Sequence, residues 1–596
     1  MIKKNWRTKS LGDVFKVETL AKELCMPRIN PKEKDLRCYN IVANLLVQRG
    51  IDTYEKAKEF FRPDLNKLHN PFLMDDMEKA VERIMMAVDA GEKILVYGDY
   101  DVDGTTAVAL VYSYLRTFYD KLEYYIPDRY NEGYGVSFKG VDYAFDNDMK
   151  LIICLDCGIK ATEEIAYASE KGIDFIVCDH HLPGKEIPKA YAILDPKLEG
   201  SKYPYDELSG CGIGFKLAQA LQKRREKPAD DIKKYLDLVA MSIAADVVPV
   251  TGENRILAFH GLQVINHKPR VGLEAILYFA NITHVEDNSP YYFNRALTIA
   301  DLSFLIGPRI NAAGRMESGR IAVKLLISTN KEKAESLAAV IDNNNESRKN
   351  KDQEATKEAK EAIMKMDKDK KSIVLCNENW HQGIIGIVAS RISEEAVKPT
   401  IIFTKTDGIM TGSARSVKNF DIYSAIESCK HLLTHFGGHK FAAGLSLKEE
   451  NFEEFQHLFE KKVEEHITNE DVTPEIDIDM NIKLGDISDK LLRILQQFQP
   501  FGPENNQPIF SSYQIYDANK VRRVGKNHLK FAAIPINENI LPISCIGFSL
   551  GQYFDLLANG NMIDICYTIE ENRYQGHTEL QLSIKDIRLS TEEKIY

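Results

Sequence analysis

The chain carries three aspartates at alternate positions, Asp99, Asp101 and Asp103, between two apolar segments. The segment before them, from Lys93 to Tyr97, has the composition of a buried strand, and the segment after them, from Ala107 to Tyr119, that of a helix. Like charges this close together repel one another and cost stability unless a cation neutralises them. The run therefore predicts a strand–turn–helix unit in which two or all three carboxylates hold a divalent metal.

The same run matches the first half of an EF-hand calcium loop, which is a rival interpretation. Such a loop needs a chelating glutamate at its twelfth position and a helix before its first position. Counting from Asp99, the twelfth residue is Leu110, and a strand-like segment precedes the run. Both departures argue against a calcium loop.

Apolar strand-like segments alternate with helix-like segments from residue 93 onward, which is typical of an α/β fold with a parallel sheet. The charged stretch 331–371 lacks Pro and Gly and has apolar residues at helical spacing, so it predicts a long connecting helix rather than a disordered linker. The predicted organisation is an N-terminal helical segment (1–74), an α/β domain with a helical extension (75–330), the connecting helix (331–371), a second α/β domain (372–466) and a small C-terminal β-barrel or sandwich (474–590).

Bulk composition narrows the class of protein. A chain of 596 residues is too long for one hydrophobic core, so several domains are expected. The net charge of −11 argues against a generally basic nucleic-acid binder but allows a local basic groove. The chain shows no signal peptide, no apolar run of the ~20 residues that span a bilayer, and ten scattered cysteines. These features predict a cytoplasmic protein with reduced thiols and no membrane association.

Further acidic and imidazole residues follow three later strand-like segments: Asp156, the triplet Asp179-His180-His181, and Asp195. A lone aspartate after a strand is usually a turn or helix-capping residue. Because the carboxyl ends of parallel strands meet at one edge of a sheet, however, these residues are expected to converge. Oxygen ligands combined with imidazole suit Mn²⁺ or Mg²⁺ better than structural zinc.

A zinc site at Cys154 and Cys157 is a weak alternative. A spacing of three residues along a strand predicts that the two side chains point to opposite faces, and the chain has no second Cys-x-x-Cys pair. These thiols are expected to pack in the core.

Taken together, these segments resemble the DHH phosphoesterases. Asp101-x-Asp103, Asp156, Asp179-His180-His181 and Asp246 correspond to the four motifs of that superfamily. Within it the chain most resembles the RecJ family of single-strand-specific 5′-to-3′ DNA exonucleases, and the resemblance covers about residues 75–590. The segments 127–135, 307–315 and 437–444 also match, in the expected order.

The resemblance implies two Mn²⁺ or Mg²⁺ ions. Asp101 would hold one ion, Asp103, His180 and Asp246 the other, and Asp156 would bridge them. Asp99 would bind the first metal or lie behind its ligands. The implied catalytic residues are Asp156, His180 and His181, of which His181 would contact the scissile phosphate. The implied substrate-binding residues are Arg129, Arg309, Arg315, Ser413, Arg415, Gly437, Gly438 and His439.

Two other segments are candidate contacts. His381 and Gln382 could touch substrate, although a capped helix start explains them almost as well. The C-terminal β segment resembles an OB-type β-barrel, a fold that binds single strands by charge and aromatic stacking, and basic residues surround its expected second hairpin. The basic residues are Arg522, Arg523, Lys526, His528 and Lys530, and the stacking candidates are Tyr513, Tyr516 and Phe531.

The leading functional hypothesis is a metal-dependent exonuclease for single-stranded DNA in repair and recombination. The alternatives are a phosphodiesterase for oligoribonucleotides or cyclic dinucleotides, a pyrophosphatase, and a non-catalytic single-strand-binding relative. Intact candidate ligands argue against the last, and the appended barrel argues for a polymeric substrate. The resemblance further implies a monomer whose partners include a helicase and a single-strand-binding protein.

Overall fold

The computed structural model describes residues 4–26, 33–285, 290–367, 369–406, 408–468, 473–536, 540–574 and 577–590. Contacts divide the chain into two compact units. Among the described residues, unit 1 comprises 70–246 and 261–474, and unit 2 comprises 4–69, 247–260 and 475–590. No helix within the described ranges is both long enough and apolar enough to cross a bilayer.

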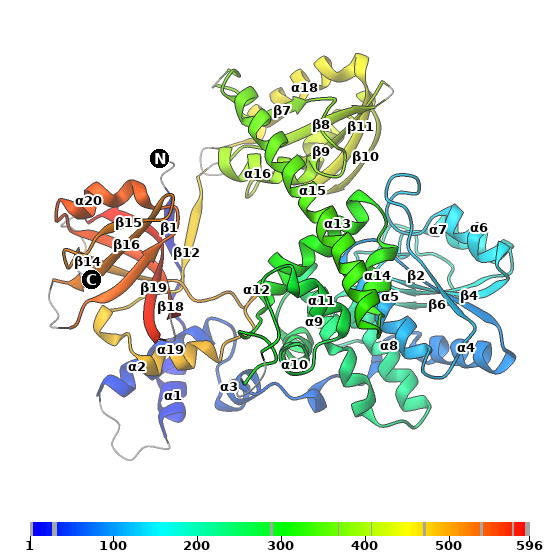
Figure 1. The fold of residues 1–596 in the computed structure, drawn as a ribbon, viewed down its shortest axis with the longest axis horizontal. Coiled ribbons are helices and arrows are strands. Elements are labelled where there is room, and N and C mark those ends of the chain that lie inside the picture. Colours follow the sequence, from blue (N-terminus) through cyan, green and yellow to red (C-terminus); the bar gives the residue numbers. More distant parts are fainter. Residues whose placement is uncertain are drawn as a thin grey trace. The chain divides into compact units, whose positions relative to one another are not determined.

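Unit 1 contains a five-stranded parallel sheet in the order β3-β2-β4-β5-β6, which confirms the predicted α/β fold (Figure 1). The strands are β2 (Lys93–Gly98), β3 (Leu122–Tyr125), β4 (Met149–Leu155), β5 (Asp174–Cys178) and β6 (Ala192–Leu194). The neighbouring helices are α4 (Met77–Ala90), α5 (Val102–Leu115), α6 (Phe138–Asp146), α7 (Thr162–Glu170) and α8 (Gly210–Arg224). The strand order reverses between β2 and β4, and such switch points are where open α/β sheets bind ligands.

A helical region follows the first sheet. It comprises α9 (Leu236–Ala245), α10 (Gly252–His267), α11 (Val271–Tyr278), α12 (Ile299–Asp301), α13 (Gly307–Met316) and α14 (Arg320–Leu326). The predicted connecting helix is present as α15 (Lys331–Ile363), which ends before residue 371. The Asn330 side chain caps its first turn by accepting a hydrogen bond from the Lys333 amide at 2.8 Å.

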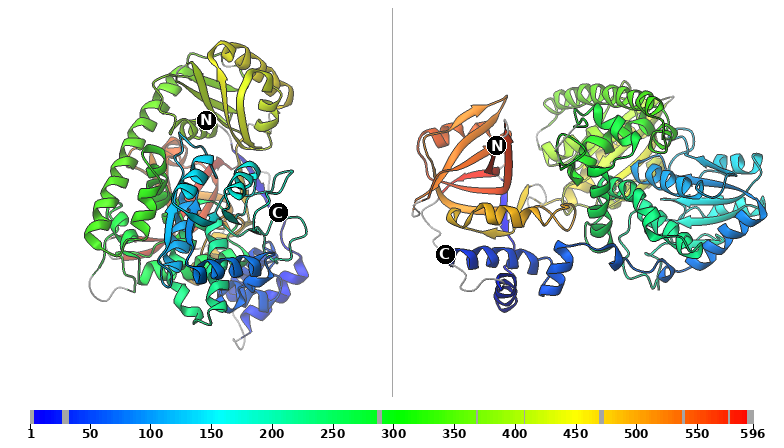
Figure 2. Two further views of the ribbon diagram at one scale, coloured as in Figure 1. Left: turned by 90° about the vertical axis from the view of Figure 1, so that its right-hand side faces the viewer. Right: turned by 60° about the horizontal axis from the view of Figure 1, so that its bottom comes forward.

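Helix α15 leads into a second sheet of order β10-β11-β9-β8-β7 (Figure 2). Only β7 and β8 pair in parallel; the other neighbours are antiparallel. The strands are β7 (Ile373–Cys376), β8 (Thr400–Thr406), β9 (Ile409–Arg415), β10 (Leu433–His439) and β11 (Ala442–Lys448). The helices are α16 (Ile385–Ala396), α17 (Ile422–Glu427) and α18 (Phe452–His466), and the buried rings of Phe403, Phe455 and Phe459 join α18 to the sheet.

Unit 2 contains a seven-stranded sheet of order β13-β14-β18-β19-β17-β16-β15. An additional antiparallel pairing between β14 and β16 closes the sheet on itself, as expected for a β-barrel. The strands are β13 (Met480–Asn481), β14 (Phe510–Asp517), β15 (Arg522–Val524), β16 (His528–Pro535), β17 (Ile543–Gly547), β18 (Ile563–Tyr574) and β19 (His577–Leu589). Helices α19 (Asp489–Gln496) and α20 (Phe554–Ala558) complete this part.

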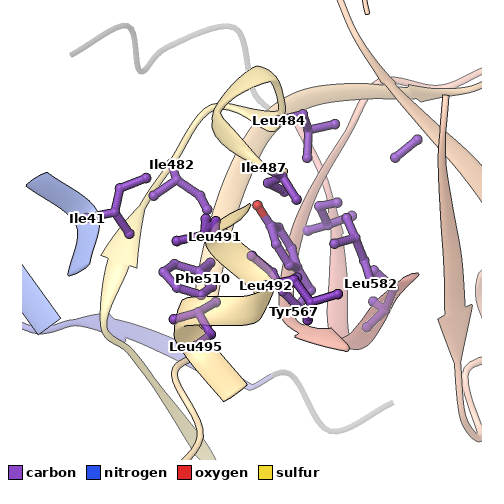
Figure 3. Close-up of a cluster of buried hydrophobic side chains, with 14 of the residues drawn as sticks. Ile41, Ile482, Leu484, Ile487, Leu491, Leu492, Leu495, Phe510, Tyr567 and Leu582 are labelled. Atoms are coloured by element: carbon purple, nitrogen blue, oxygen red, sulfur yellow. The ribbon is translucent and has the colours of Figure 1, made fainter. Parts of the chain in front are cut away.

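The core of unit 2 includes the N-terminal segment as well as the barrel. Leu491, Leu492 and Leu495 of α19 lie beside Phe510 and Tyr567 of the barrel (Figure 3). Ile41 belongs to the same core. The segment supplies helices α1 (Val14–Cys25), α2 (Glu33–Val47) and α3 (Tyr54–Phe61).

Strand β1 (Asn5–Thr8) was not anticipated, since only helices were predicted for residues 1–74. It pairs in parallel with β12 (Glu475–Ile478), and Asn5 lies opposite Glu475. The N-terminal segment is thus held to unit 2 by backbone pairing as well as by its apolar core.

The stretch Val247–His260 also belongs to unit 2, although the sequence placed it within the 75–330 domain. Arg255 explains the difference. Its buried guanidinium donates hydrogen bonds to the carbonyl oxygens of Phe60, Phe498 and Gln499 at 2.9–3.0 Å and lies 3.7 Å from the centre of the Phe60 ring. These partners are far away in sequence, so no local pattern predicts the contact.

Candidate active site

Three strand ends of the first sheet bring acidic and imidazole side chains together. Asp99, Asp156 and His180 follow β2, β4 and β5 and are almost fully buried, with exposed fractions of 0%, 2% and 5%. Asp246 follows α9 and keeps 28% of its side chain exposed. The predicted convergence at the carboxyl edge of the sheet is therefore present in the structure.

His180 lies at the centre of this group. Its Nε2 atom is 3.2 Å from Asp156 Oδ1, 3.5 Å from Asp246 Oδ2 and 3.7 Å from Asp103 Oδ2. Two sets of possible ligand atoms each lie within 4.8 Å of one another: Asp103, His180 and Asp246, and Asp156, His180 and His181. Because both sets include His180, the five side chains form one continuous group of possible metal ligands.

Asp103 is oriented by the start of helix α8. Its carboxylate accepts hydrogen bonds from the backbone amides of Gly210 and Cys211 and from the hydroxyl of Ser242, each at 2.7 Å. The amides at a helix N-terminus carry partial positive charge and stabilise a buried carboxylate. Gly210 is required by this approach, because a Cβ there would lie 2.7 Å from Asp156 Cβ.

Asp101 and Asp99 belong to neither of the two ligand sets. Asp101 caps helix α5 by accepting a hydrogen bond from the Gly104 amide at 3.0 Å. The backbone of Asp99 packs closely against Gly104, because a Cβ on Gly104 would lie 2.7 Å from the Asp99 backbone nitrogen. Asp195 is also buried, and its carboxylate accepts a hydrogen bond from the Lys197 amide without joining either set.

The electrostatics of the pocket fit a cation. Burial, and then neighbouring carboxylates, raise the pKa values of Asp99, Asp156 and Asp246 well above the usual range. Asp99 Oδ2, Asp156 Oδ1 and both ring nitrogens of His180 have no hydrogen-bond partner among the described residues. Leaving such groups buried without partners is costly, and a divalent metal bound by oxygen and imidazole would remove that cost.

The prediction that Cys154 and Cys157 point to opposite faces is wrong. Their sulfur atoms are 3.3 Å apart, because β4 ends at Leu155 and Asp156 adopts a left-handed backbone conformation with φ of 61°. Both thiols are buried, and neither belongs to a metal-ligating group found among the described residues. The turn that brings them together also directs Asp156 into the acidic pocket.

His181 is held by two partners that the sequence did not predict. Its Nδ1 atom is 2.7 Å from Asp179 Oδ1, and its Nε2 atom is 3.1 Å from the Tyr134 hydroxyl. Burial alone would raise the pKa of Asp179, but the hydrogen bond from His181 lowers it to about 2. Asp179 therefore orients His181, and Tyr134 extends the hydrogen-bonded chain toward solvent.

Four polar side chains from the two domains of unit 1 form a second cluster, which we call the arginine cluster: Arg129, Arg315, Ser413 and Arg415. Ser413 Oγ accepts a hydrogen bond from Arg415 Nη1 at 3.0 Å. Burial and the nearby charge of Arg129 lower the pKa of Arg415, and burial, Arg129, Arg348 and Arg415 lower that of Arg315 to about 10. Guanidinium groups whose positive charges repel one another in this way are suited to binding an anion such as phosphate.

Arg309 is not part of this cluster. It is 8% exposed, and its Nε atom lies 2.8 Å from Asp342 Oδ1 on α15. Its other nitrogens donate to the carbonyl oxygens of Leu305 and Phe279. Since protein acceptors occupy this guanidinium, we correct the expectation that it binds substrate: Arg309 joins α13 to the connecting helix.

Strand β10 brings the predicted Gly437, Gly438 and His439 to the edge of the second sheet. Gly438 and His439 line a cavity of about 390 Å³ whose other walls include Tyr134, Cys157 and His181. Gly438 has φ of 151°, and a Cβ there would lie 2.8 Å from Ala443 Cβ, so the close pairing of β10 with β11 requires glycine. Residues from both domains of unit 1 thus border the His181 side of the acidic pocket.

In unit 2, the predicted basic residues lie on the β15–β16 hairpin. Arg522 and Lys530 are directly opposite each other across the two strands, an arrangement that is unfavourable without an anion. Phe531 is 2% exposed and belongs to the core, so it is excluded as a stacking residue. Phe548, which the sequence analysis missed, is 61% exposed and packs against His528 with ring centres 5.3 Å apart.

Comparisons with known proteins agree with this architecture. Residues 93–243 match the N-terminal domain of the DHH family, residues 369–465 the DHHA1 domain, and residues 478–586 the RecJ OB domain. The single-stranded-DNA-specific exonuclease RecJ of Bacillus subtilis is 34% identical over 94% of this chain and 70% of its own length. RecJ of Escherichia coli is 32% identical over 86% of this chain and 90% of its own length.

Solved structures give the same result. The crystal structure of RecJ from Thermus thermophilus in complex with Mn²⁺ matches 98% of this chain and 80% of its own, with a TM-score of 0.81 and 25% identity. A second structure, of an exonuclease RecJ bound to manganese, is 30% identical over 69% of this chain and 98% of its own, with a TM-score of 0.58. The chain therefore belongs to the RecJ family of single-stranded-DNA-specific exonucleases.

Proposed function

We propose that this chain is a metal-dependent exonuclease that hydrolyses single-stranded DNA from its 5′ end, in DNA repair and recombination. The observation that carries the proposal is the presence of two complementary sites in unit 1. One is the acidic pocket around His180, which suits divalent cations, and the other is the arginine cluster, which suits a phosphate.

In the acidic pocket, Asp103, His180 and Asp246 would hold one ion and Asp156 would be shared with a second. Asp101 is the further ligand that the family resemblance implies. Relatives solved with Mn²⁺ or Mg²⁺ support these two metals. When bound, such a pair supplies an activated water and polarises the scissile phosphate. His181, oriented by Asp179, would donate a hydrogen bond to that phosphate from Nε2 in exchange for its contact with Tyr134.

The 5′-to-3′ polarity is taken from the family resemblance, and the arginine cluster offers a binding site for the terminal phosphate that this polarity requires. A terminal 5′-phosphate carries more negative charge than an internal phosphodiester and offers three oxygens, which several guanidinium groups and the Ser413 hydroxyl can share. Gly437, Gly438 and His439 would line the path of the strand beside the cavity that contains His181. The basic β15–β16 hairpin of unit 2 provides a further contact for a polymer, which favours DNA over a dinucleotide substrate.

The decisive experiment uses single-stranded DNA and RNA labelled at either end, incubated with the full chain and Mn²⁺. We expect the 5′ label to be released first from DNA, with slower action on RNA and on duplex DNA. Release from the 3′ end would contradict the proposed polarity, and preference for RNA would favour the oligoribonucleotide alternative. A cytoplasmic location, a monomeric state, and a helicase and a single-strand-binding protein as partners stay predictions.

A further inference from the structure

The loop that precedes helix α16 in the second domain touches the catalytic domain at the arginine cluster. Arg315 Nη1 donates a hydrogen bond to the carbonyl oxygen of Gly383 at 3.3 Å, and the Tyr130 hydroxyl donates one to the carbonyl oxygen of Arg315. The rings of Tyr130 and His381 meet edge to face, with centres 6.2 Å apart. The loop therefore contacts the Arg315 side chain through Gly383. Through His381 it also contacts the Tyr130 ring, whose hydroxyl binds the Arg315 backbone.

The shape of this loop is set from within and from the connecting helix. The Gly383 amide donates to His381 Nδ1 at 3.0 Å, which closes the turn. The Trp380 indole donates to Glu358 on α15 at 2.8 Å. His381 thus acts as a turn-forming residue here, and α15 supports the loop from behind.

No side chain fits at position 383. A Cβ on Gly383 would lie 2.7 Å from the Tyr130 hydroxyl oxygen, 2.9 Å from the Arg315 carbonyl oxygen and 3.1 Å from His381 Nδ1. Two of these three atoms belong to the catalytic domain. Any larger residue must therefore separate the loop from Arg315 or rotate the Arg315 guanidinium away from its acceptor.

We propose that Gly383 and Tyr130 are positioning residues, which hold Arg315 in the orientation that binds the terminal 5′-phosphate. This inference rests on the proposed function, because it assigns the arginine cluster to that phosphate. Arg315 otherwise lies among like charges, which would push its guanidinium out of the cluster. The Gly383 carbonyl accepts a hydrogen bond from that guanidinium, and the Tyr130 hydroxyl holds Arg315 through its backbone carbonyl, so neither residue needs to touch DNA.

The test compares Gly383→Ala and Tyr130→Phe with the unaltered chain on oligonucleotides that carry either a 5′-phosphate or a 5′-hydroxyl. Gly184→Ala is the matched control, because a Cβ there would be 3.6 Å from its nearest neighbour and the backbone is not left-handed. We expect KM for the 5′-phosphorylated strand to rise about tenfold in Gly383→Ala and a few-fold in Tyr130→Phe, since one oriented guanidinium contact is weakened. The kcat, the Mn²⁺ dependence and KM for the 5′-hydroxyl strand should stay within about twofold of the unaltered chain.

Each possible result either supports the inference or contradicts it. Equal losses on both substrates, or a Gly383→Ala variant that behaves like Gly184→Ala, would overturn the inference. If Gly383→Ala fails to fold, Tyr130→Phe decides the question, because it keeps the ring and removes only the hydroxyl. If the unaltered chain digests from the 5′ end but has the same KM for 5′-phosphorylated and 5′-hydroxyl strands, this inference alone is overturned. If it digests from the 3′ end, the proposed function is overturned as well.

Discussion

At the scale of single residues, Asp156 costs stability in the folded chain although it is needed to bind metal. It is 2% exposed, adopts a left-handed backbone and lies among other carboxylates that raise its pKa together with burial. Such a residue destabilises the metal-free fold and is retained because a cation compensates it.

Replacing Asp156 with Asn should therefore abolish turnover without harming the fold. We expect the metal-free melting temperature of Asp156→Asn to equal or exceed that of the unaltered chain, because Asn is neutral without having to take up a proton on folding. Saturating Mn²⁺ should stabilise the unaltered chain by about 2–3 kcal/mol at a hundredfold excess over Kd, and the variant far less. Calorimetry with and without Mn²⁺ measures both effects, and a variant that keeps full activity would contradict the assignment.

The raised pKa values also predict an unusual pH dependence. Asp99, Asp156 and Asp246 hold a proton to higher pH in the folded chain than in the unfolded chain, and burial raises the pKa of Asp195 to about 7. The folded state binds more protons in this window, so its stability falls as pH rises from the usual carboxyl pKa through the raised values.

In the presence of a chelator, the melting temperature should consequently be higher near pH 6 than near pH 8. With excess Mn²⁺ the order should reverse, because protonated carboxylates bind metal poorly. The pH slope in chelator should be shallower for Asp156→Asn, and an identical slope in both proteins would show that other groups cause it.

At the scale of elements, the start of helix α8 acts as part of the active site although it holds no proposed metal ligand. Its first amides orient Asp103, and Gly210 allows the helix to approach Asp156. Gly210→Ala should displace this helix end, weaken Mn²⁺ binding about tenfold or more and lower kcat with it, since ligand orientation controls metal affinity. Isothermal titration of Mn²⁺ measures the loss, and unchanged affinity would contradict the role of α8.

The elements of the first sheet could be predicted from sequence because their signal is local. Each strand is a short apolar run, and each helix begins after a polar turn, as at Asp101, where a capping carboxylate precedes α5. The acidic residues could be placed together because parallel strands share one carboxyl edge.

Other features could not be predicted from the sequence, because they depend on backbone conformation or on contacts between distant residues. The contact between Cys154 and Cys157 depends on the backbone of Asp156, and the burial of Arg309 depends on Asp342, which lies 33 residues further along the chain. Tyr134 gains its place through contacts with His181, which follows a distant strand, and with the ring of Tyr100. Strand β1 has four mostly exposed residues, too few to show a period of two.

At the scale of the whole molecule, the β15–β16 hairpin of unit 2 predicts how salt affects binding. Replacing both Arg522 and Lys530 with Ala should remove about two phosphate contacts, which lowers the slope of log affinity against log salt by about 1.4 for a single strand. Stability should not fall, because the two charges face each other across the hairpin. Fluorescence anisotropy with a long oligonucleotide over a salt series measures the slope. The control is Arg37→Ala, which removes an arginine elsewhere in unit 2 whose charge is already paired with Asp486 at 2.8 Å.

The pairing of β1 with β12 has a consequence for biosynthesis. The two strands are separated by 470 residues, so at 5–20 residues per second the ribosome needs roughly 20–90 s to supply the second after the first. Throughout that interval the apolar faces of α1 and α2 lack the barrel residues that cover them in the finished chain. Nascent chains of this protein must therefore stay protected from aggregation until translation has passed β12, because β1 is made long before the strand with which it pairs.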